Sequence, residues 1–232
     1  MTTVKFGLST TFPCGYLPEQ DERLLVYLDD QPLSPILYAA LQNQGFRRSE
    51  QYVYKPYCQK CNACQSIRIP VHKFKLTRSQ KRIKSKTKRF WNNISPNVKD
   101  NYYPLYEKYV NGKHFGGVMY PANKSQLESF TDCDWMDQLY IELYDAEKLI
   151  AVAICDISPE SVSAAYTFYD PEYSDYSLGT LMILLQIELA QELERSWLYL
   201  GYFIKQCNKM NYKTKFHPYQ ILVENKWLEY NN

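Results

Sequence analysis

Apolar and polar positions in the second half of the chain predict a sheet interrupted by one long helix. Three runs alternate as strands do, and they lie at 139–144, 149–157 and 162–169. Apolar residues then recur at helical spacing over 178–193, with Ser177 as the expected N-cap. A further strand is predicted at 197–203. The predicted order is therefore β-β-β-α-β.

This order, followed by a short helix, is the core arrangement of the acyltransferase fold of the N-acetyltransferase type. We predict an α/β (α+β) protein in which a GNAT-like mixed sheet is flanked by helices. The first half adds a cysteine-bearing N-terminal α/β domain. We expect this domain at 1–110, a connecting segment rich in Gly, Pro and Asn at 111–134, and the acyltransferase-like domain at 135–232.

The first half carries clear start and stop signals. A strand is predicted at 24–28, and a helix then opens at Ser34 with Pro35 in its first turn and ends at Gly45. A second helix begins at Thr77. Further elements of the first half are two strands and a third helix, expected at 52–55, 66–71 and 102–110.

Composition fits a globular protein that works inside the cell. The chain has 232 residues, of which 45% are hydrophobic and 16% aromatic, so it can bury a sizeable core. Its first residues lack the apolar core of a signal peptide, and no apolar run approaches the roughly 20 residues of a membrane span. We expect a cytoplasmic protein without membrane contact, whose seven cysteines stay reduced.

Charge is distributed unevenly along the chain. The formal net charge is only +2, yet the segment 73–89 holds nine Lys and Arg residues and no acid. Such an asymmetry indicates a polyanionic partner, although a charge run is more commonly just a solvated face. Six of these residues form the predicted RNA-binding set, namely Arg78, Lys81, Arg82, Lys84, Lys88 and Arg89.

Three evenly spaced thiols lie between two predicted strands. Cys58, Cys61 and Cys64 could form a four-thiolate set with Cys14, and zinc or an iron–sulfur centre accepts such ligands. Against this, three cysteines on one tight loop reach a single zinc ion only if the loop folds back, and buried thiols often simply pack. Both interpretations remain open.

Several motifs in order resemble the arginyl-tRNA–protein transferase family, and its bacterial, leucyl-tRNA-dependent branch most. In the first half they are Gly45-Phe-Arg-Arg-Ser49, Tyr54-Lys-Pro56, Ile67-Arg-Ile-Pro70 and Arg78-Ser-Gln-Lys-Arg82. In the second half they are Tyr166-Thr-Phe-Tyr-Asp-Pro171, Ser177-Leu-Gly179, Tyr199-Leu-Gly-Tyr202 and Met210 through Pro218. The resemblance covers nearly the whole chain. One departure is that the eukaryotic branch has an N-terminal Cys-x-x-Cys, whereas here Cys14 stands alone.

The resemblance implies an aminoacyltransferase that moves leucine from leucyl-tRNA to proteins whose N-terminal residue is Asp or Glu. Its product would enter the N-degron (N-end rule) pathway, where an adaptor and a protease act on it. Transfer from an ester to an amine needs no ATP and no organic cofactor, because cleavage of the ester drives formation of the amide. The tRNA acceptor stem becomes the implied partner of the basic segment.

An acidic N-terminal side chain needs a cationic reader, and several cations flank the cysteines. Arg68 is the first choice, because a guanidinium can hold a carboxylate through two parallel hydrogen bonds. The other predicted substrate-binding residues are Lys55, Arg47, Arg48 and Tyr54. An ion pair that merely steadies the sheet is the alternative role for Arg68.

Three residues of the second half are predicted to serve catalysis. Asp156 is the candidate base, Tyr202 could donate to the leaving ribose or the oxyanion, and Lys213 approaches from the C-terminal segment. With 22 tyrosines in the chain, packing is the competing role for Tyr202.

Three other functions compete with leucine transfer. An arginine donor would need an acidic pocket for guanidinium, and sequence separates this poorly from a leucine donor. A coenzyme-A acetyltransferase commonly has a Gly-rich pyrophosphate loop, which the segment 174–179 does not supply. A non-catalytic, metal-dependent RNA-binding module would need only the cysteines and the basic segment.

Overall fold

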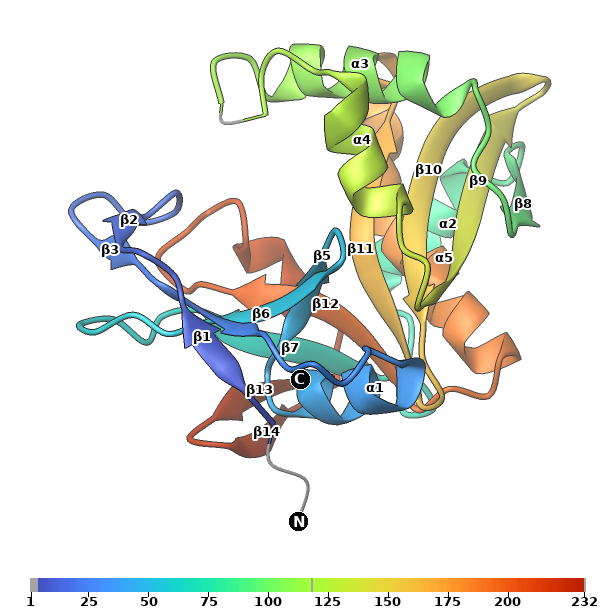
Figure 1. The fold of residues 1–232 in the computed structure, drawn as a ribbon. Coiled ribbons are helices and arrows are strands. Elements are labelled where there is room, and N and C mark those ends of the chain that lie inside the picture. Colours follow the sequence, from blue (N-terminus) through green and yellow to red (C-terminus); the bar gives the residue numbers. More distant parts are fainter. Residues whose placement is uncertain (1–3, 118, 232) are drawn as a thin grey trace.

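A large mixed sheet with helices on both faces forms the centre of the molecule (Figure 1). The computed structural model describes residues 4–117 and 119–231. The sheet has eight strands in the order β14-β13-β7-β12-β11-β10-β9-β8. Neighbours are antiparallel except for β11 and β12, which run parallel.

The predicted β-β-β-α-β core is confirmed. Three antiparallel strands are followed by a helix and then by a strand parallel to the third, and their bounds are β9 Asp137–Asp145, β10 Lys148–Ile157, β11 Ser161–Tyr169, α5 Leu178–Glu192 and β12 Trp197–Phe203. A short 3₁₀ helix, η2 (Asn211–Lys215), comes next. The GNAT-like fold class is therefore correct.

The sheet also includes strands from the first 110 residues. β7 (Gln65–Pro70) lies between β12 and β13 (Tyr219–Val223), and β8 (Trp91–Ser95) pairs with β9 at the far edge. β13 and β14 (Lys226–Tyr230) form a hairpin at the other edge. Strands from both sides of the expected boundary at residue 110 are thus hydrogen-bonded within one sheet.

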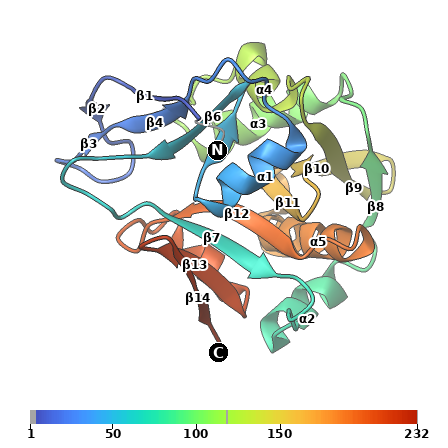
Figure 2. The ribbon, with the colours of Figure 1, turned by 60° about the horizontal axis from the view of Figure 1, so that its bottom comes forward.

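Helices cover the two faces of the sheet (Figures 1 and 2). α5 packs on β9 to β12 with α2 (Arg78–Lys86) against it, while α3 (Tyr102–Lys113) packs on β10 and β11. Alternate residues of β10 serve the two faces, because Ala151 and Ala153 join the core beside α5 whereas Val152 and Ile154 join the core beside α3. A strand buried on both faces must be largely apolar, and β10 is apolar from Leu149 to Cys155.

Smaller sheets and one helix make up the N-terminal part. The four-stranded sheet has the order β1-β4-β6-β5, and the two-stranded one pairs β2 with β3. Their bounds are β1 Phe6–Leu8, β2 Phe12–Pro13, β3 Asp21–Glu22, β4 Leu24–Tyr27, β5 Arg47–Ser49 and β6 Tyr52–Pro56. Helix α1 (Pro35–Asn43) buries Tyr38 and Leu41 in a core with Phe46 and Val53.

Two of the three predicted helix starts have the expected cap. The Ser34 side chain accepts a hydrogen bond from the amide of Leu37, and Thr77 forms a capping box with Gln80. Ser177 stands at the N-cap of α5, but its side chain makes no capping bond. It ends the 3₁₀ helix η1 (Pro171–Tyr176) in the left-handed region, with φ of 53°, and this conformation excludes the expected capping role.

The segment expected to be a connection, 111–134, contains a helix. α4 (Lys124–Thr131) opens with a capping box between Asn123 and Gln126 and packs Leu127 and Phe130 into the core beside α3. Within the described residues, no helix is long and apolar enough to cross a membrane.

A buried carboxylate ties the edge of the sheet to α3. Glu142 on β9 is fully buried and accepts hydrogen bonds from Tyr102 and Asn93 at 2.7 and 2.8 Å, while Lys99 lies 2.7 Å away. Burial raises the pKa of Glu142, but the hydrogen bonds from Asn93, Lys99, Tyr102 and Tyr144 outweigh it, so the pKa lies below its ordinary value of 4.5. The ionised form is the one that stabilises the fold.

We therefore predict that Glu142→Gln lowers the free energy of unfolding by about 1–3 kcal/mol at pH 7, because the buried donors around residue 142 lose the charge that they stabilise. A pKa lowered by folding gives stability that is present above pH 4.5 and is lost as pH falls through the folded-state value. The deficit of the variant should therefore shrink below pH 4.5. Urea denaturation at several pH values measures it, with exposed Glu147→Gln as the control. A deficit independent of pH would contradict this account.

Candidate active site

The parallel strands β11 and β12 pair over only three residues. Their ladder joins Ser161 to Trp197 and ends at Ser163 with Tyr199, although both strands continue. Ala165 is the extra residue of a bulge, because β10 pairs with Ala164 and Tyr166 but skips it. Ligands of α/β sheets bind beyond the carboxyl ends of parallel strands, so this parting marks the place to look for a site.

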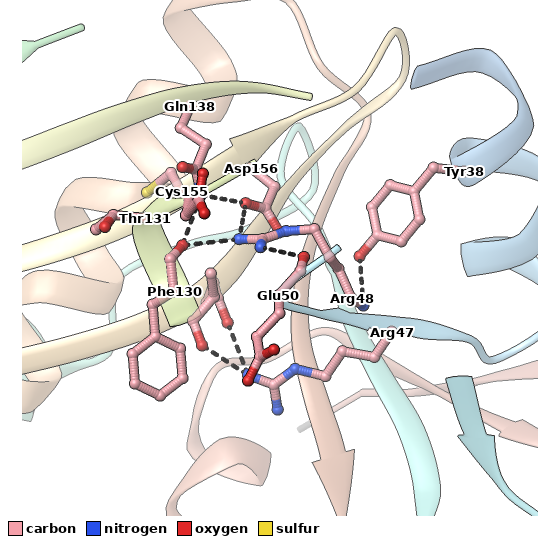
Figure 3. Close-up of polar contacts among 12 residues, drawn as sticks. Tyr38, Arg47, Arg48, Glu50, Phe130, Thr131, Gln138, Cys155 and Asp156 are labelled. Atoms are coloured by element: carbon pink, nitrogen blue, oxygen red, sulfur yellow. Dashed lines mark hydrogen bonds and ion pairs between the residues drawn. The ribbon is translucent and has the colours of Figure 1, made fainter. Parts of the chain in front are cut away.

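Arg47 of β5 fills the space where the two strands part (Figure 3). Its Nη2 donates to the Ala165 carbonyl at 2.6 Å and lies 3.5 Å from the Ala164 carbonyl. On the other side is Gly201 of β12, with φ of 77°, and a Cβ there would lie 2.6 Å from Nη1 of Arg47. Glycine at this position therefore provides both the backbone conformation and the room for the guanidinium.

Two predicted catalytic residues lie beside Arg47. The Tyr202 hydroxyl is 3.0 Å from the Gly45 carbonyl and 3.2 Å from the Tyr54 carbonyl, and it can donate to either. Lys213, on η2, donates from Nζ to the main-chain carbonyl of Tyr202 at 2.6 Å. The structure thus brings together Arg47, Tyr54, Tyr202 and Lys213 from the predicted set.

This cluster holds positive charge without a carboxylate partner. Within 4–117 and 119–231, neither Arg47 nor Lys213 forms an ion pair. Burial and, to a smaller extent, the nearby charge of Arg47 together lower the pKa of Lys213 to about 7. Burial also raises the pKa of Tyr202 well above its ordinary value. Such a site is suited to an anionic ligand.

Arg48 and Asp156 form a buried ion pair (Figure 3). Nε and Nη2 of Arg48 donate to the two carboxylate oxygens at 2.9 and 2.7 Å, and Gln138 donates to the same carboxylate at 2.8 Å. The carbonyls of Glu50 and Phe130 accept two further hydrogen bonds from Arg48. The Asp156 carboxylate is therefore engaged by Arg48, and the geometry disfavours it as the acceptor of a substrate proton. In the same way, Arg48 is engaged by Asp156, which disfavours it as the partner of a substrate carboxylate.

We predict that Asp156→Ala destabilises the fold by about 3–5 kcal/mol, because it leaves the Arg48 charge buried and unpaired. The double variant Arg48→Met, Asp156→Leu should recover most of this loss. Urea denaturation measures both, and Asp30→Asn, at an exposed ion pair with Lys5, should change stability by at most about 1 kcal/mol. A stable but inactive Asp156→Ala variant would restore Asp156 as the base.

Arg68 is enclosed by neutral groups away from this cluster. Its guanidinium carbon lies 3.6 Å from the ring centre of Trp197 and 3.9 Å from that of Trp227. Gln220, Asn43 and the Tyr199 hydroxyl accept its hydrogen bonds, each at 2.9 Å. These contacts join β7 to β12, the C-terminal hairpin and α1. The geometry favours a structural role for Arg68. Its partners are aromatic, amide and hydroxyl groups, whereas the alternative considered from sequence was an ion pair.

Lys55 and the predicted RNA-binding residues occupy other surfaces. Lys55 donates to the Gln44 carbonyl at 3.3 Å and lies over the Phe46 ring, on the smaller sheet. On or near α2, Lys84 pairs with Glu188 and Arg89 with Asp145. The other four cations of the set are exposed and form no ion pair within the described residues; they are Arg78, Lys81, Arg82 and Lys88.

Cys58, Cys61 and Cys64 lie between β6 and β7, as the sequence predicted, and they and Cys14 are free thiols. Burial, with smaller effects from the nearby Cys14 and Cys58, raises the pKa of Cys64 to about 12. In the part of the chain that the structure describes, no three Cys, His, Asp or Glu side chains are arranged as metal ligands. Ligation by Cys14, Cys58, Cys61 and Cys64 stays a prediction.

Sequence reasoning missed several residues of the cluster. Tyr16 and Tyr212 are close enough for the Arg47 charge to lower the pKa of each, although burial raises it more. Gly201 had a usable signal, because an isolated glycine inside a strand often marks a bulge or a close approach. Nothing in the local sequence marks Tyr16, since its neighbours across the site are far along the chain.

The solved structures support the fold. The C-terminal domain of a protein named as a lysylphosphatidylglycerol synthetase from Agrobacterium fabrum superposes with a TM-score of 0.53, at 12% identity, over 84% of this chain and 64% of that chain. At this identity the likeness concerns architecture only. The core order and the parted parallel strands define a protein of the GNAT-like acyltransferase class.

Family models place the chain more narrowly. The model "Arginine-tRNA-protein transferase, N terminus" matches residues 12–82, and "Arginine-tRNA-protein transferase, C terminus" matches residues 101–223. The chain belongs to the arginine-tRNA-protein transferase family. The expected family is thereby confirmed.

Curated relatives match almost from end to end. One from Aeromonas hydrophila, named aspartate/glutamate leucyltransferase, is 45% identical over 224 residues, covering 97% of this chain and 94% of its own length. Another with the same name, from Vibrio cholerae, is 43% identical over 225 residues, covering 97% of this chain and 96% of its own.

Proposed function

We propose that this protein transfers leucine from leucyl-tRNA to the α-amine of proteins that begin with Asp or Glu. The observation that carries the proposal is the match of 97% of the chain to relatives named aspartate/glutamate leucyltransferase. The product would carry a new N-terminal leucine. In the N-degron pathway, an adaptor and a protease would then act on it.

The geometry of the site suits this reaction. The enzyme must orient an amine against an ester, keep the amine unprotonated and stabilise an oxyanion. Arg47 supplies positive charge where the strands part, and the Lys213 amine lies beside it. The exposed cations Arg78, Lys81 and Arg82 of α2 are suited to phosphate contacts with the tRNA.

We propose that Arg47 binds the acidic side chain of the acceptor's N-terminal residue. Arg48 already holds Asp156, and both faces of Arg68 are covered by indole rings. Arg47 bonds only main-chain carbonyls within the described residues, so its charge is not neutralised. A carboxylate bound beside it would gain a charge-assisted hydrogen bond that an amide cannot match.

The activity itself can be tested directly with labelled Leu-tRNA or Arg-tRNA and peptides that begin with Asp, Glu, Asn or Ala. We expect label from Leu-tRNA on the Asp and Glu peptides only. Transfer from Arg-tRNA alone would contradict the donor, and label on Ala peptides would contradict the acceptor. Tight RNA binding without transfer from either tRNA would favour the non-catalytic RNA-binding module.

If Arg47 recognises the acidic side chain, Arg47→Lys should reduce kcat/KM for Asp peptides by roughly 10- to 100-fold, which corresponds to the free energy of one hydrogen bond to a charged group. The ratio of rates for Asp over Asn peptides should fall, while the affinity for Leu-tRNA should stay unchanged. Steady-state kinetics with both peptides and a tRNA-binding assay measure these quantities. An equal loss for Asp and Asn peptides would instead mean that Arg47 only supports the strands.

A further inference from the structure

Lys213 is unusual because it is a buried lysine without an acidic partner. Its exposed fraction is 5%, and its Nζ donates a hydrogen bond to the Tyr202 carbonyl at 2.6 Å. Lysine is almost never this buried unless it is paired with an opposite charge. The 3₁₀ helix η2 holds the side chain against the part of β12 that lies beyond the parting from β11.

The groups that surround Lys213 favour its neutral form. Arg47 brings a second positive charge, which opposes protonation of Nζ, whereas the Tyr212 ring, with its centre 5.9 Å from Nζ, is a weak cation–π contact that favours the charged form. The thiols of Cys207 and Cys64 are the remaining titratable neighbours, and their effect is smaller than that of Arg47 and opposite to it. With burial as the largest cause, the pKa of Lys213 falls to about 7, so roughly half of the side chains are free amines at neutral pH.

We infer that Lys213 is the base that takes the proton from the acceptor's α-amino nitrogen during transfer. This inference rests on the proposed leucyl transfer. A neutral amine that donates one hydrogen to the Tyr202 carbonyl keeps its lone pair free to accept a proton. The carbonyl fixes the direction of Nζ, and the splayed strands place it next to Arg47, where the acidic acceptor binds.

The proton balance of the step is simple. The acceptor's neutral α-amine attacks the ester carbonyl carbon and a C–N bond forms, while the carbonyl π bond opens to an oxyanion and the nitrogen becomes positively charged. The oxyanion re-forms the carbonyl when the ester C–O bond breaks. Lys213 takes one proton from that nitrogen. The C–O bond to the ribose then breaks, and Lys213 gives the proton to the departing ribose oxygen, which leaves as a hydroxyl. Lys213 ends the cycle neutral, so no other proton donor is needed.

Other groups of the site suit this task less well. The Asp156 carboxylate is held by two hydrogen bonds from Arg48 and one from Gln138. The Tyr202 hydroxyl can donate its proton to the carbonyl of Gly45 or of Tyr54. Because the pKa of Tyr202 is raised, this hydroxyl stays protonated at neutral pH and is a poor proton acceptor. Lys213 combines access to a neutral form with a fixed position.

The test compares Lys213→Met and Lys213→Arg with Lys215→Met, a control on the same 3₁₀ helix whose side chain is exposed. Single-turnover transfer to an Asp peptide should fall by about 10²- to 10⁴-fold in both Lys213 variants and stay unchanged in the control. The wild-type rate should fall as pH drops below about 7, where Lys213 becomes protonated. The variants should keep only the ionisation of the acceptor amine, near 7.7–8.0.

A second measurement does not depend on transfer. In protein labelled with ¹³Cε-lysine, one lysine resonance should titrate with a midpoint near 7 and be missing from Lys213→Arg. Retained transfer in both variants would overturn the inference and leave the proposed function intact. A Lys213 resonance that titrates near the ordinary lysine value of 10.5 would also overturn it. A wild-type protein that transfers nothing would overturn both proposals.

Discussion

The short pairing between β11 and β12 is the constraint on which the candidate site depends. Where the strands part, the carbonyls of Ala164 and Ala165 lose the donors that a neighbouring strand would provide, and buried carbonyls need a partner. Arg47 supplies that partner from a different sheet. One side chain therefore couples the N-terminal sheet to the central strands, and the arrangement leaves a cation at the point where the sheet opens.

Arg47, Arg48 and Arg68 show how the same residue type acquires different roles from its surroundings. The first meets carbonyls, the second a carboxylate, and the third two indole rings. Among the described residues neither the first nor the third has a carboxylate partner, and of these two only Arg47 lies beside Tyr202 and Lys213. All three lie in family motifs. The motifs therefore identify the protein family, but they do not distinguish a substrate-binding arginine from a structural one.

Local signals in the sequence predicted much of the fold. The caps at Ser34 and Thr77, the apolar runs of β9 to β11 and the period of α5 depend on neighbours within a few residues. Elements without such patterns were missed. β8 is a mostly polar, exposed edge strand, and the β13–β14 hairpin turns at Glu224 and Asn225, both with positive φ, without the Asn-Gly or Asp-Gly pair that usually marks such a turn.

The site was predicted in part for the same reason. Tyr202 and Lys213 could be proposed because they lie in distinctive segments, and the structure does place them together. The partners of Arg48 and Arg68 could not be foreseen, because Asp156 and Gln220 lie more than a hundred residues away in the chain. Long-range pairing is decided by the topology of the sheet, which a single sequence does not display.

The place of β7 in the sheet affects how the chain folds during synthesis. Both neighbours of β7, β12 and β13, leave the ribosome long after β7 itself. Until they emerge, β7 exposes two unpaired edges beside an apolar face, a state open to aggregation. The long sequence separation of these pairs also slows folding, because their loops must close before the strands gain any contact energy. An early holding chaperone would therefore have its natural target in the segment that carries the cysteines into the sheet.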